Sequence, residues 1–238
     1  MAKKFLIFGA TGAIGSTLAH KLHEDKLDCH LIGRNEEELK NISNKLNYTY
    51  SVCDVLKLNF VQDLVKDLSK TEIIGIAYCV GSIDIKPFRL TKANDFVSSY
   101  VLNLVAVTEI IRNFQENLKN NKASIVLFST VAAKKGFSNH SIISSAKAAI
   151  EGLTVALAAE LAPNIRINCI APSLTKSKIA STVIKNSTIE ESIAKMHPLK
   201  RIGQGIDSAN LANFLLTDKS SWITGQIIGV DGGRSNIA

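Results

Sequence analysis

Three glycines at three-residue intervals stand near the start of the chain and could bind a phosphate. Residues 6–8 form a short apolar run, which favours a strand buried on both faces, and a helical pattern starts directly after Gly15. Gly9, Gly12 and Gly15 permit a sharp turn and a close approach of the backbone to a ligand. The free N–H groups and the positive dipole end of the following helix favour a phosphate or pyrophosphate. The pattern predicts a nucleotide site, although a glycine-rich turn that binds nothing has the same sequence signature.

A second informative position follows the second predicted strand. A site for NAD usually places an acid at this strand end, where it holds the ribose hydroxyls. Here Gly33 occupies that position and Arg34 follows it. No carboxylate repels a 2′-phosphate, and a guanidinium is available to pair with one. We therefore predict NADP(H) in preference to NAD(H); an exposed Arg34 that only opens a helix is the alternative.

Two more strand ends carry residues suited to a cofactor. Asp54 follows the third predicted strand, where its carboxylate can accept from an adenine amino group or cap the next helix. Gly81 follows the fourth, where the missing side chain lets the backbone pass close to the cofactor.

Strands and helices alternate along the whole chain, without a linker or a repeat. Such alternation predicts an α/β fold in which helices cover both faces of a mainly parallel sheet. The segment 173–198 is the longest stretch between predicted core elements, and we expect it to form a substrate lid. The predicted strands are 4–8, 29–32, 48–53, 73–78, 124–128, 166–170 and 227–230, and the predicted helices are 14–26, 36–46, 60–68, 95–117, 144–161 and 208–215.

Composition excludes several other classes of protein. The formal net charge is +7, but lysines and arginines are dispersed and no basic run alternates with aromatic residues, so we expect no nucleic-acid partner. No apolar run reaches the roughly 18 residues of a membrane span, and no signal peptide precedes the first strand. The four cysteines are scattered singly among apolar residues, which predicts buried free thiols, no metal site and a cytoplasmic location.

The chain resembles the short-chain dehydrogenase/reductase family over essentially its whole length. This resemblance implies a single domain over residues 1–238, a Rossmann-type doubly wound parallel sheet, and an NAD(P)(H)-dependent oxidoreductase that transfers hydride to or from a carbonyl, alcohol or activated alkene. The matching stretches are GATGAIG at 9–15, DV at 54–55, NL at 103–104, STVA at 129–132, SAKAAIEGL at 145–153, Asn168, AP at 171–172, PLKRIG at 198–203 and ITGQIIGVDGG at 223–233.

The resemblance also assigns roles to individual residues. Asn103 takes the position of the asparagine that holds a proton-relay water, and Lys147 that of the lysine that binds the ribose and lowers the pKa of a tyrosine. The serine that orients the substrate oxygen becomes Thr130, with Ser129 beside it as a possible substitute. The predicted cofactor-binding residues are Gly9, Thr11, Gly12, Ile14, Gly15, Arg34, Asp54, Val55, Val80, Gly81, Lys147, Pro172 and Thr175.

The family's active-site tyrosine is missing. Ile143 occupies its position, four residues before Lys147, and an isoleucine has no proton to give. Loss of a positioned general acid typically lowers a rate by about 10²–10⁴-fold. His140, seven residues before Lys147, is the strongest replacement, because a related enoyl reductase branch carries its tyrosine at this spacing and histidine can donate near neutral pH. The alternative is a His140 that is merely exposed on a loop.

Further departures lie next to the glycine motif. Phe8 stands where the family has a threonine, and Tyr78-Cys79-Val80-Gly81 replaces Asn-Asn-Ala-Gly. We expect packing to replace the hydrogen bonds that these polar residues make in the family.

Three functions remain open at this point. The first is an NADP(H)-dependent oxidoreductase whose proton comes from His140, from water or by way of an activated substrate such as an enone. The second is a catalytically silent nucleotide-binding subunit or sensor, and the third is a lyase or isomerase. The helix over 144–161 is rich in small residues around most of its circumference, which predicts either association or burial of this helix within its own domain. The resemblance implies a homotetramer or homodimer, because the family commonly pairs this helix across a dimer.

Overall fold

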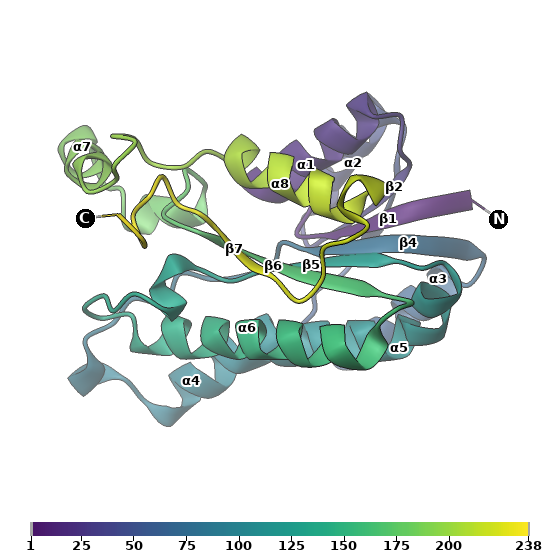
Figure 1. Ribbon diagram of the computed structural model, residues 1–238, viewed down its shortest axis with the longest axis horizontal. Helices are drawn as coiled ribbons and strands as arrows, with labels where there is room; N and C mark the ends of the chain where they lie inside the picture. The colour runs from purple at the N-terminus through teal and green to yellow at the C-terminus, as the bar shows by residue number, and fades with distance from the viewer. Residues whose placement is uncertain (1, 238) are drawn as a thin grey trace.

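Seven parallel strands form one sheet in the order β3-β2-β1-β4-β5-β6-β7 (Figure 1). The computed structural model describes residues 2–237 of the chain. The strand order reverses its direction between β1 and β4, so that the loops after these two strands diverge and leave a crevice. The strands are β1 (Ala2–Phe8), β2 (Cys29–Gly33), β3 (Thr49–Val52), β4 (Thr71–Tyr78), β5 (Ser124–Phe128), β6 (Arg166–Pro172) and β7 (Ile227–Val230).

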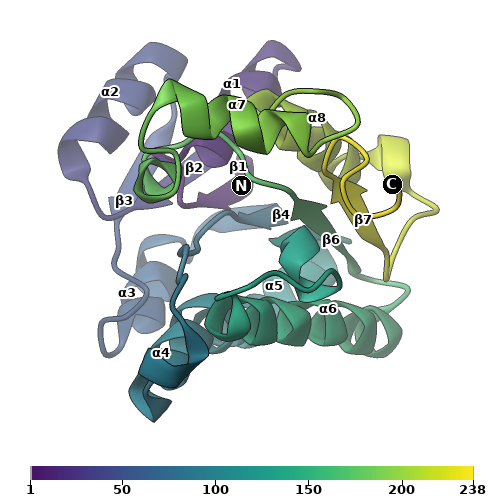
Figure 2. The ribbon, with the colours of Figure 1, turned by 90° about the vertical axis from the view of Figure 1, so that its left-hand side faces the viewer.

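Helices cover both faces of the sheet, as the alternation of elements predicts (Figures 1 and 2). One face carries α1 (Ala13–Glu24), α2 (Glu36–Leu46) and α8 (Gly205–Leu216). The other carries α3 (Phe60–Asp67), α5 (Ala106–Asn120) and α6 (Ser141–Leu161), with α4 (Ala93–Tyr100) beside α6, while α7 (Ser187–Lys195) stands apart from the sheet. The Rossmann-type fold class is therefore confirmed.

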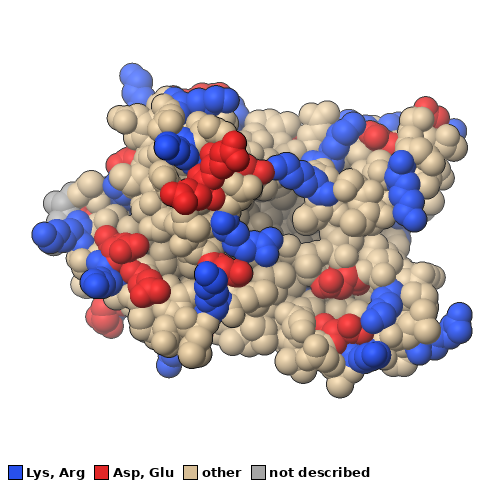
Figure 3. Space-filling view, turned by 180° about the vertical axis from the view of Figure 1, so that it is seen from behind, with Lys and Arg blue, Asp and Glu red and all other residues tan. Residues whose placement is uncertain are grey.

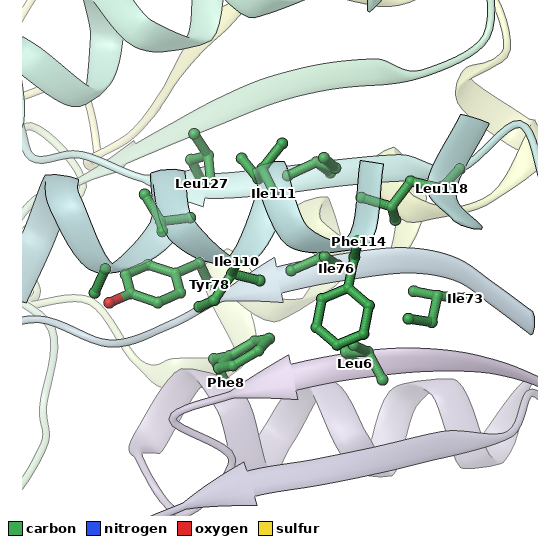
Figure 4. Close-up of a cluster of buried hydrophobic side chains, with 14 of the residues drawn as sticks. Leu6, Phe8, Ile73, Ile76, Tyr78, Ile110, Ile111, Phe114, Leu118 and Leu127 are labelled. Atoms are coloured by element: carbon green, nitrogen blue, oxygen red, sulfur yellow. The ribbon is translucent and has the colours of Figure 1, made fainter. Parts of the chain in front are cut away.

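The larger of the two cores lies between the sheet and α5. Leu6, Ile76 and Leu127 point from the strands toward Ile110 and Phe114 of α5 (Figure 4). All five side chains are buried. Because the strands are covered on both faces, they read as continuous apolar runs rather than as alternating patterns.

The helix that carries the predicted catalytic residues begins earlier than expected. Helix α6 starts at Ser141 rather than Ser144, which places Ile143 in its first turn, one turn before Lys147. It is the one helix in the described chain that is long and apolar enough to cross a membrane by length and composition alone. Here it packs on the sheet through a buried stripe that includes Lys147 and Glu151, so we regard it as a core helix.

The helix predicted over 95–117 is interrupted in the structure. Helix α4 ends at Tyr100, a π-helical turn spans Val101–Val105, and α5 follows. Such turns frequently occur at functional sites, and this one carries Asn103. The phenol hydroxyl of Tyr78 donates a 2.7 Å hydrogen bond to the carbonyl of Leu102 within the turn.

The charged surface agrees with the expectation of dispersed charge. On the face shown in Figure 3, lysines and arginines are interspersed with acidic side chains, and no broad area of one sign appears. On this face the distribution is that of a solvated surface, and the expected absence of a nucleic-acid partner stays a prediction.

Candidate active site

A large cavity of about 1350 Å³ opens at the carboxyl ends of the strands, the edge that faces the viewer in Figure 2. It runs from the loops after β1, β2 and β3 to the loops after β5, β6 and β7. Ligands of open parallel sheets bind in this position. All predicted site residues line the cavity except Asn103, which is completely buried.

The glycine turn is closed so tightly that side chains would not fit. Gly9 has a φ of +74°, and a Cβ there would lie 2.9 Å from the carbonyl carbon of Cys79. A Cβ on Gly15 would lie 2.4 Å from the carbonyl oxygen of Gly9. Gly12 caps α1 without any side-chain hydrogen bond, which leaves the first N–H groups of the helix available. These features fit the pyrophosphate of a dinucleotide.

The end of β2 presents a cation without an acidic partner. Arg34 is exposed, lines the cavity and makes no ion pair within the described chain. Asn35 caps α2 by accepting from the N–H of Glu38. Glu38 itself pairs with Lys178, which extends from the far side of the cavity.

Asp54 lies at the same end of the cavity and does not cap a helix. One carboxylate oxygen accepts from the N–H of Leu56 at 3.1 Å, and α3 begins only after Asn59. Its carboxylate still lines the cavity, so the predicted contact with an adenine amino group stays a prediction.

Lys147 and Asn103 meet at Gly81. A Cβ on Gly81 would lie 3.2 Å from Lys147 Nζ and 3.3 Å from Asn103 Oδ1, so a glycine keeps this space open. The amide nitrogen of Asn103 donates to the carbonyl of Ser99 at 2.9 Å, whereas its Oδ1 is buried with no partner. An unpaired buried oxygen is costly and marks a place for a hydrogen-bond donor.

The environment of Lys147 favours release of its proton. Its Nζ donates to the carbonyl of Phe128 at 2.9 Å, which uses one of the three N–H bonds of the ammonium group. Burial lowers the pKa of Lys147 to about 8, and no carboxylate stands beside it to reverse this shift. The side chain at the cavity wall is therefore mainly an ammonium group at pH 7 and loses its proton as the pH rises through about 8.

The two hydroxyls after β5 differ in their availability. Ser129 Oγ donates to Glu151 Oε1 at 2.8 Å and lies 3.2 Å from the carbonyl of Lys147, so it is occupied within the protein. Thr130 Oγ1 accepts a 3.3 Å hydrogen bond from the N–H of Ala132, and its O–H remains free to donate. Thr130 is thus the better placed of the two to orient a substrate oxygen.

Ile143 lines the cavity and is almost fully buried. No tyrosine contributes to the cavity wall in the part of the chain that the structure describes. His140 stands at the wall too, half-buried at the N-terminus of α6, where its Nδ1 donates to the carbonyl of Ser138 at 2.7 Å. Its ring packs on Phe137, with 5.5 Å between the ring centroids.

Packing replaces the polar link between the glycine turn and β4, as predicted. The rings of Phe8 and Tyr78 lie 5.9 Å apart at 45°, and both side chains are buried (Figure 4). The Tyr78 hydroxyl reaches past this contact to the turn that carries Asn103.

The segment 173–198 forms one wall of the cavity. It contains a short 3₁₀ helix (Ile179–Thr182) and α7. Pro172 and Thr175 line the cavity where the segment leaves β6, and Thr175 pairs with Gly203 in a short parallel bridge. This position suits the predicted lid, but its opening and closing remain a prediction.

Two features of the cavity could not be expected from the motifs. Arg234, just after β7, places its guanidinium 4.9 Å from the centre of the Phe137 ring. Ser173 Oγ and the buried His197 Nε2 lie 2.8 Å apart and tie the segment 173–198 together. The only sequence signal for Arg234 is that it directly follows Gly232 and Gly233, whose positive φ angles turn the chain toward the cavity.

Comparison with known proteins identifies a matching family model and several similar proteins. Residues 9–235 match a family model described as "Enoyl-(Acyl carrier protein) reductase". A 3-oxoacyl-(acyl-carrier-protein) reductase, FabG, of Rickettsia felis is 32% identical over 242 residues, which cover 97% of this chain and 96% of that protein. A chloroplastic tropinone reductase homolog of Arabidopsis thaliana is 32% identical over 97% of this chain and 74% of its own length.

Solved structures agree with these relatives. ElxO with NADP bound is 26% identical, with a TM-score of 0.89 over 98% of this chain and 99% of that chain. A variant of ElxO in which a tyrosine is replaced by phenylalanine, solved with NADPH bound, has the same TM-score of 0.89 at 25% identity, over 98% of this chain and 99% of its own. Fold, cavity and relatives together establish that the chain belongs to the short-chain dehydrogenase/reductase family of NAD(P)-dependent oxidoreductases.

Proposed function

We propose that this protein is an NADP(H)-dependent reductase of activated substrates, such as enones or quinones, and that Lys147 supplies the proton that a tyrosine supplies elsewhere in the family. One observation carries the proposal: Lys147 Nζ and the unpaired Asn103 Oδ1 face the same open space at Gly81, and Ile143 lies one turn away on the cavity wall. The named relatives are reductases, which does not favour a silent nucleotide-binding subunit.

The residues present fit a nicotinamide dinucleotide. The turn over Gly9, Gly12 and Gly15 would hold the pyrophosphate, and the Arg34 guanidinium would pair with a 2′-phosphate. When bound, the nicotinamide supplies the hydride. The similar ElxO structures, which were solved with NADP and with NADPH bound, support a cofactor that carries the 2′-phosphate.

The chain's own groups would then manage the proton. Thr130 Oγ1 donates a hydrogen bond that orients the substrate oxygen, and the Lys147 ammonium gives the proton as hydride arrives at the substrate carbon. Lys147 is left as a neutral amine, a form that its buried position favours, and it takes a new proton from solvent. Asn103 Oδ1 offers an acceptor along that route. Activated substrates suit this site because they demand less of the acid.

The test is NADPH consumption against matched sets of simple ketones, quinones and enones. We expect turnover of quinones or enones and little of simple ketones. Simple ketones reduced as fast as enones would contradict the proposal, and so would NADPH that binds but is oxidised by nothing in the panel.

Replacement of Arg34 by alanine tests the choice of cofactor. Loss of a charge-assisted pair with the 2′-phosphate should weaken NADPH binding by about tenfold or more, while NADH binding stays unchanged. Titration calorimetry with both cofactors measures this, and NADH serves as the internal control. An unchanged ratio of the two dissociation constants would argue against the role of Arg34.

Replacement of His140 by glutamine separates the two proton donors. Since His140 Nδ1 is already held by Ser138 and Lys147 lies deeper in the wall, we expect the rate of enone reduction to change by less than about threefold. Steady-state rates between pH 5 and pH 9 measure this. A loss of 10²-fold or more in the His140→Gln variant would transfer the role to His140.

The predicted homodimer or homotetramer extends this proposal. Ala148, Gly152, Val155 and Ala159 of α6 remain exposed and form a face of small residues. That face suits close helix pairing, and sedimentation of the purified protein tests it.

A further inference from the structure

Arg234 lies in the cavity wall at the end opposite to Arg34. The turn Asp231-Gly232-Gly233 places it there, with φ angles of +62° and +87° at the two glycines. Asp231 stabilises the turn by accepting from the N–H groups of Gly233 and Ser235, each at 2.9 Å. The C-terminal segment runs beside α7 (Figure 1), and Arg234 Nη2 lies 3.4 Å from Met196 Sδ, just beyond that helix.

The guanidinium of Arg234 is half-buried and has no acidic partner within the described residues. Its contacts are the Phe137 ring, 4.9 Å away, and the sulfur of Met196. The nearby carboxylate of Asp231 is occupied by its own turn. Burial lowers the pKa of Arg234 with no acid to oppose the shift, although the group remains charged. A partly buried cation without a counter-charge is unfavourable until an anion pairs with it.

No carboxylate of residues 2–237 forms an ion pair with Arg234, and the nearby Asp231 is held by its own turn. The acids that line the cavity are Glu36, Glu37, Glu38 and Asp54, and all of them lie after β2 or β3. The apolar side chains of the wall after β5, β6 and β7 include Phe137, Ile143, Leu174, Ile193 and Met196, and its polar ones include Thr130, His140, Lys147, Ser173 and Lys178. A ligand that fills this end meets these apolar side chains, the Arg234 guanidinium beside Phe137, and Lys147 deeper in the wall.

We propose that Arg234 binds a carboxylate of the substrate, so that the substrate is an anion with an apolar body. The planar guanidinium matches a carboxylate in a two-point hydrogen bond, and the apolar wall strengthens that pair by excluding water. This inference rests on the proposed function, because the anion is a substrate group only if reduction takes place in the same cavity. It gives Arg234 a role in specificity, separate from the proton supplied by Lys147.

The experiment compares acids with their neutral primary amides. Protein saturated with NADP⁺, so that the pyrophosphate site is filled, is titrated by calorimetry with cinnamate against cinnamamide and with hexanoate against hexanamide; phenyl phosphate tests a different anion. We expect the carboxylates to bind about 10- to 100-fold more tightly than their amides. The Arg234→Gln and Arg234→Met variants should lose the preference for carboxylates over amides while their NADP⁺ affinity stays unchanged. The control variant Arg112→Gln, which removes an exposed charge on α5, should keep that preference.

The outcomes separate the two proposals. Failure of NADP⁺ to bind in the first titration would contradict the proposed function and this inference with it. Equal binding of acids and amides by the NADP⁺-loaded natural sequence would overturn only the role of Arg234, even if both variants were too unstable to study. The role of Arg234 would also be overturned if a folded Arg234 variant still bound acids more tightly than amides. If phenyl phosphate bound more tightly than either carboxylate, the proposed ligand group would be a phosphate instead of a carboxylate.

Discussion

Ile143→Tyr should increase the reduction of simple ketones by about 10²–10⁴-fold. Residue 143 lies one helical turn before Lys147 on α6, and both side chains line the cavity. A phenol at this position would give the substrate oxygen a second general acid, in addition to Lys147, at the position where the family carries its tyrosine. The Lys147 ammonium beneath it would lower the pKa of the phenol. Steady-state NADPH oxidation with a panel of simple ketones measures the gain.

Ile143→Phe is the matched control for this substitution. It adds the same ring without a hydroxyl, so it reproduces any effect of bulk on substrate binding but supplies no proton. We expect the phenylalanine variant to stay at the ketone rate of the natural sequence. Equal gains in the two variants would mean that shape, rather than the missing acid, limits ketone reduction. No gain in either would mean that the rest of the site does not support this chemistry.

Lys147→Met should lower kcat/KM for enone reduction by at least about 10²-fold. The natural protein should also lose activity as the pH rises through the lowered pKa of Lys147, at about 8. Below that pH the ammonium form holds a proton to give, and above it the neutral amine holds none. A pH profile of kcat/KM with saturating NADPH measures this fall of about tenfold per pH unit on the alkaline side.

Two controls distinguish proton donation from cofactor binding and from charge. Measurement of NADPH affinity in Lys147→Met shows how much of the loss comes from weaker binding. Lys147→Arg keeps a positive charge but holds its proton too firmly to donate it. If Lys147→Arg restores the natural rate, the ammonium acts only as a charge. A flat alkaline profile in the natural protein would contradict proton donation by Lys147.

The sequence predicted the sheet and the cofactor cavity because their signals are local. The strand over 124–128 matches β5 and the helix over 36–46 matches α2 residue for residue, since apolar runs and end signals define them. The glycine turn was equally predictable, because its tight geometry excludes every larger side chain at Gly9 and Gly15.

The features that were missed depend on contacts between distant parts of the chain. The π-helical turn around Asn103 keeps the apolar pattern of a continuous helix, and its bond from Tyr78 to Leu102 joins segments 24 residues apart. Arg234 follows a strand without any periodic pattern, so only the folded chain places it against Phe137. The assignment of the family's tyrosine position to Ile143 rests on the resemblance alone and stays a prediction, although Ile143 does line the cavity one turn before Lys147.

We propose that this chain keeps a dinucleotide cavity while it lacks the phenol of its family. Direct titration of the folded protein with NADPH and with NADH tests this most simply. We predict uptake of one dinucleotide per chain, tighter for NADPH, by the natural sequence and by Ile143→Phe alike. A folded protein that takes up neither dinucleotide would contradict the claim.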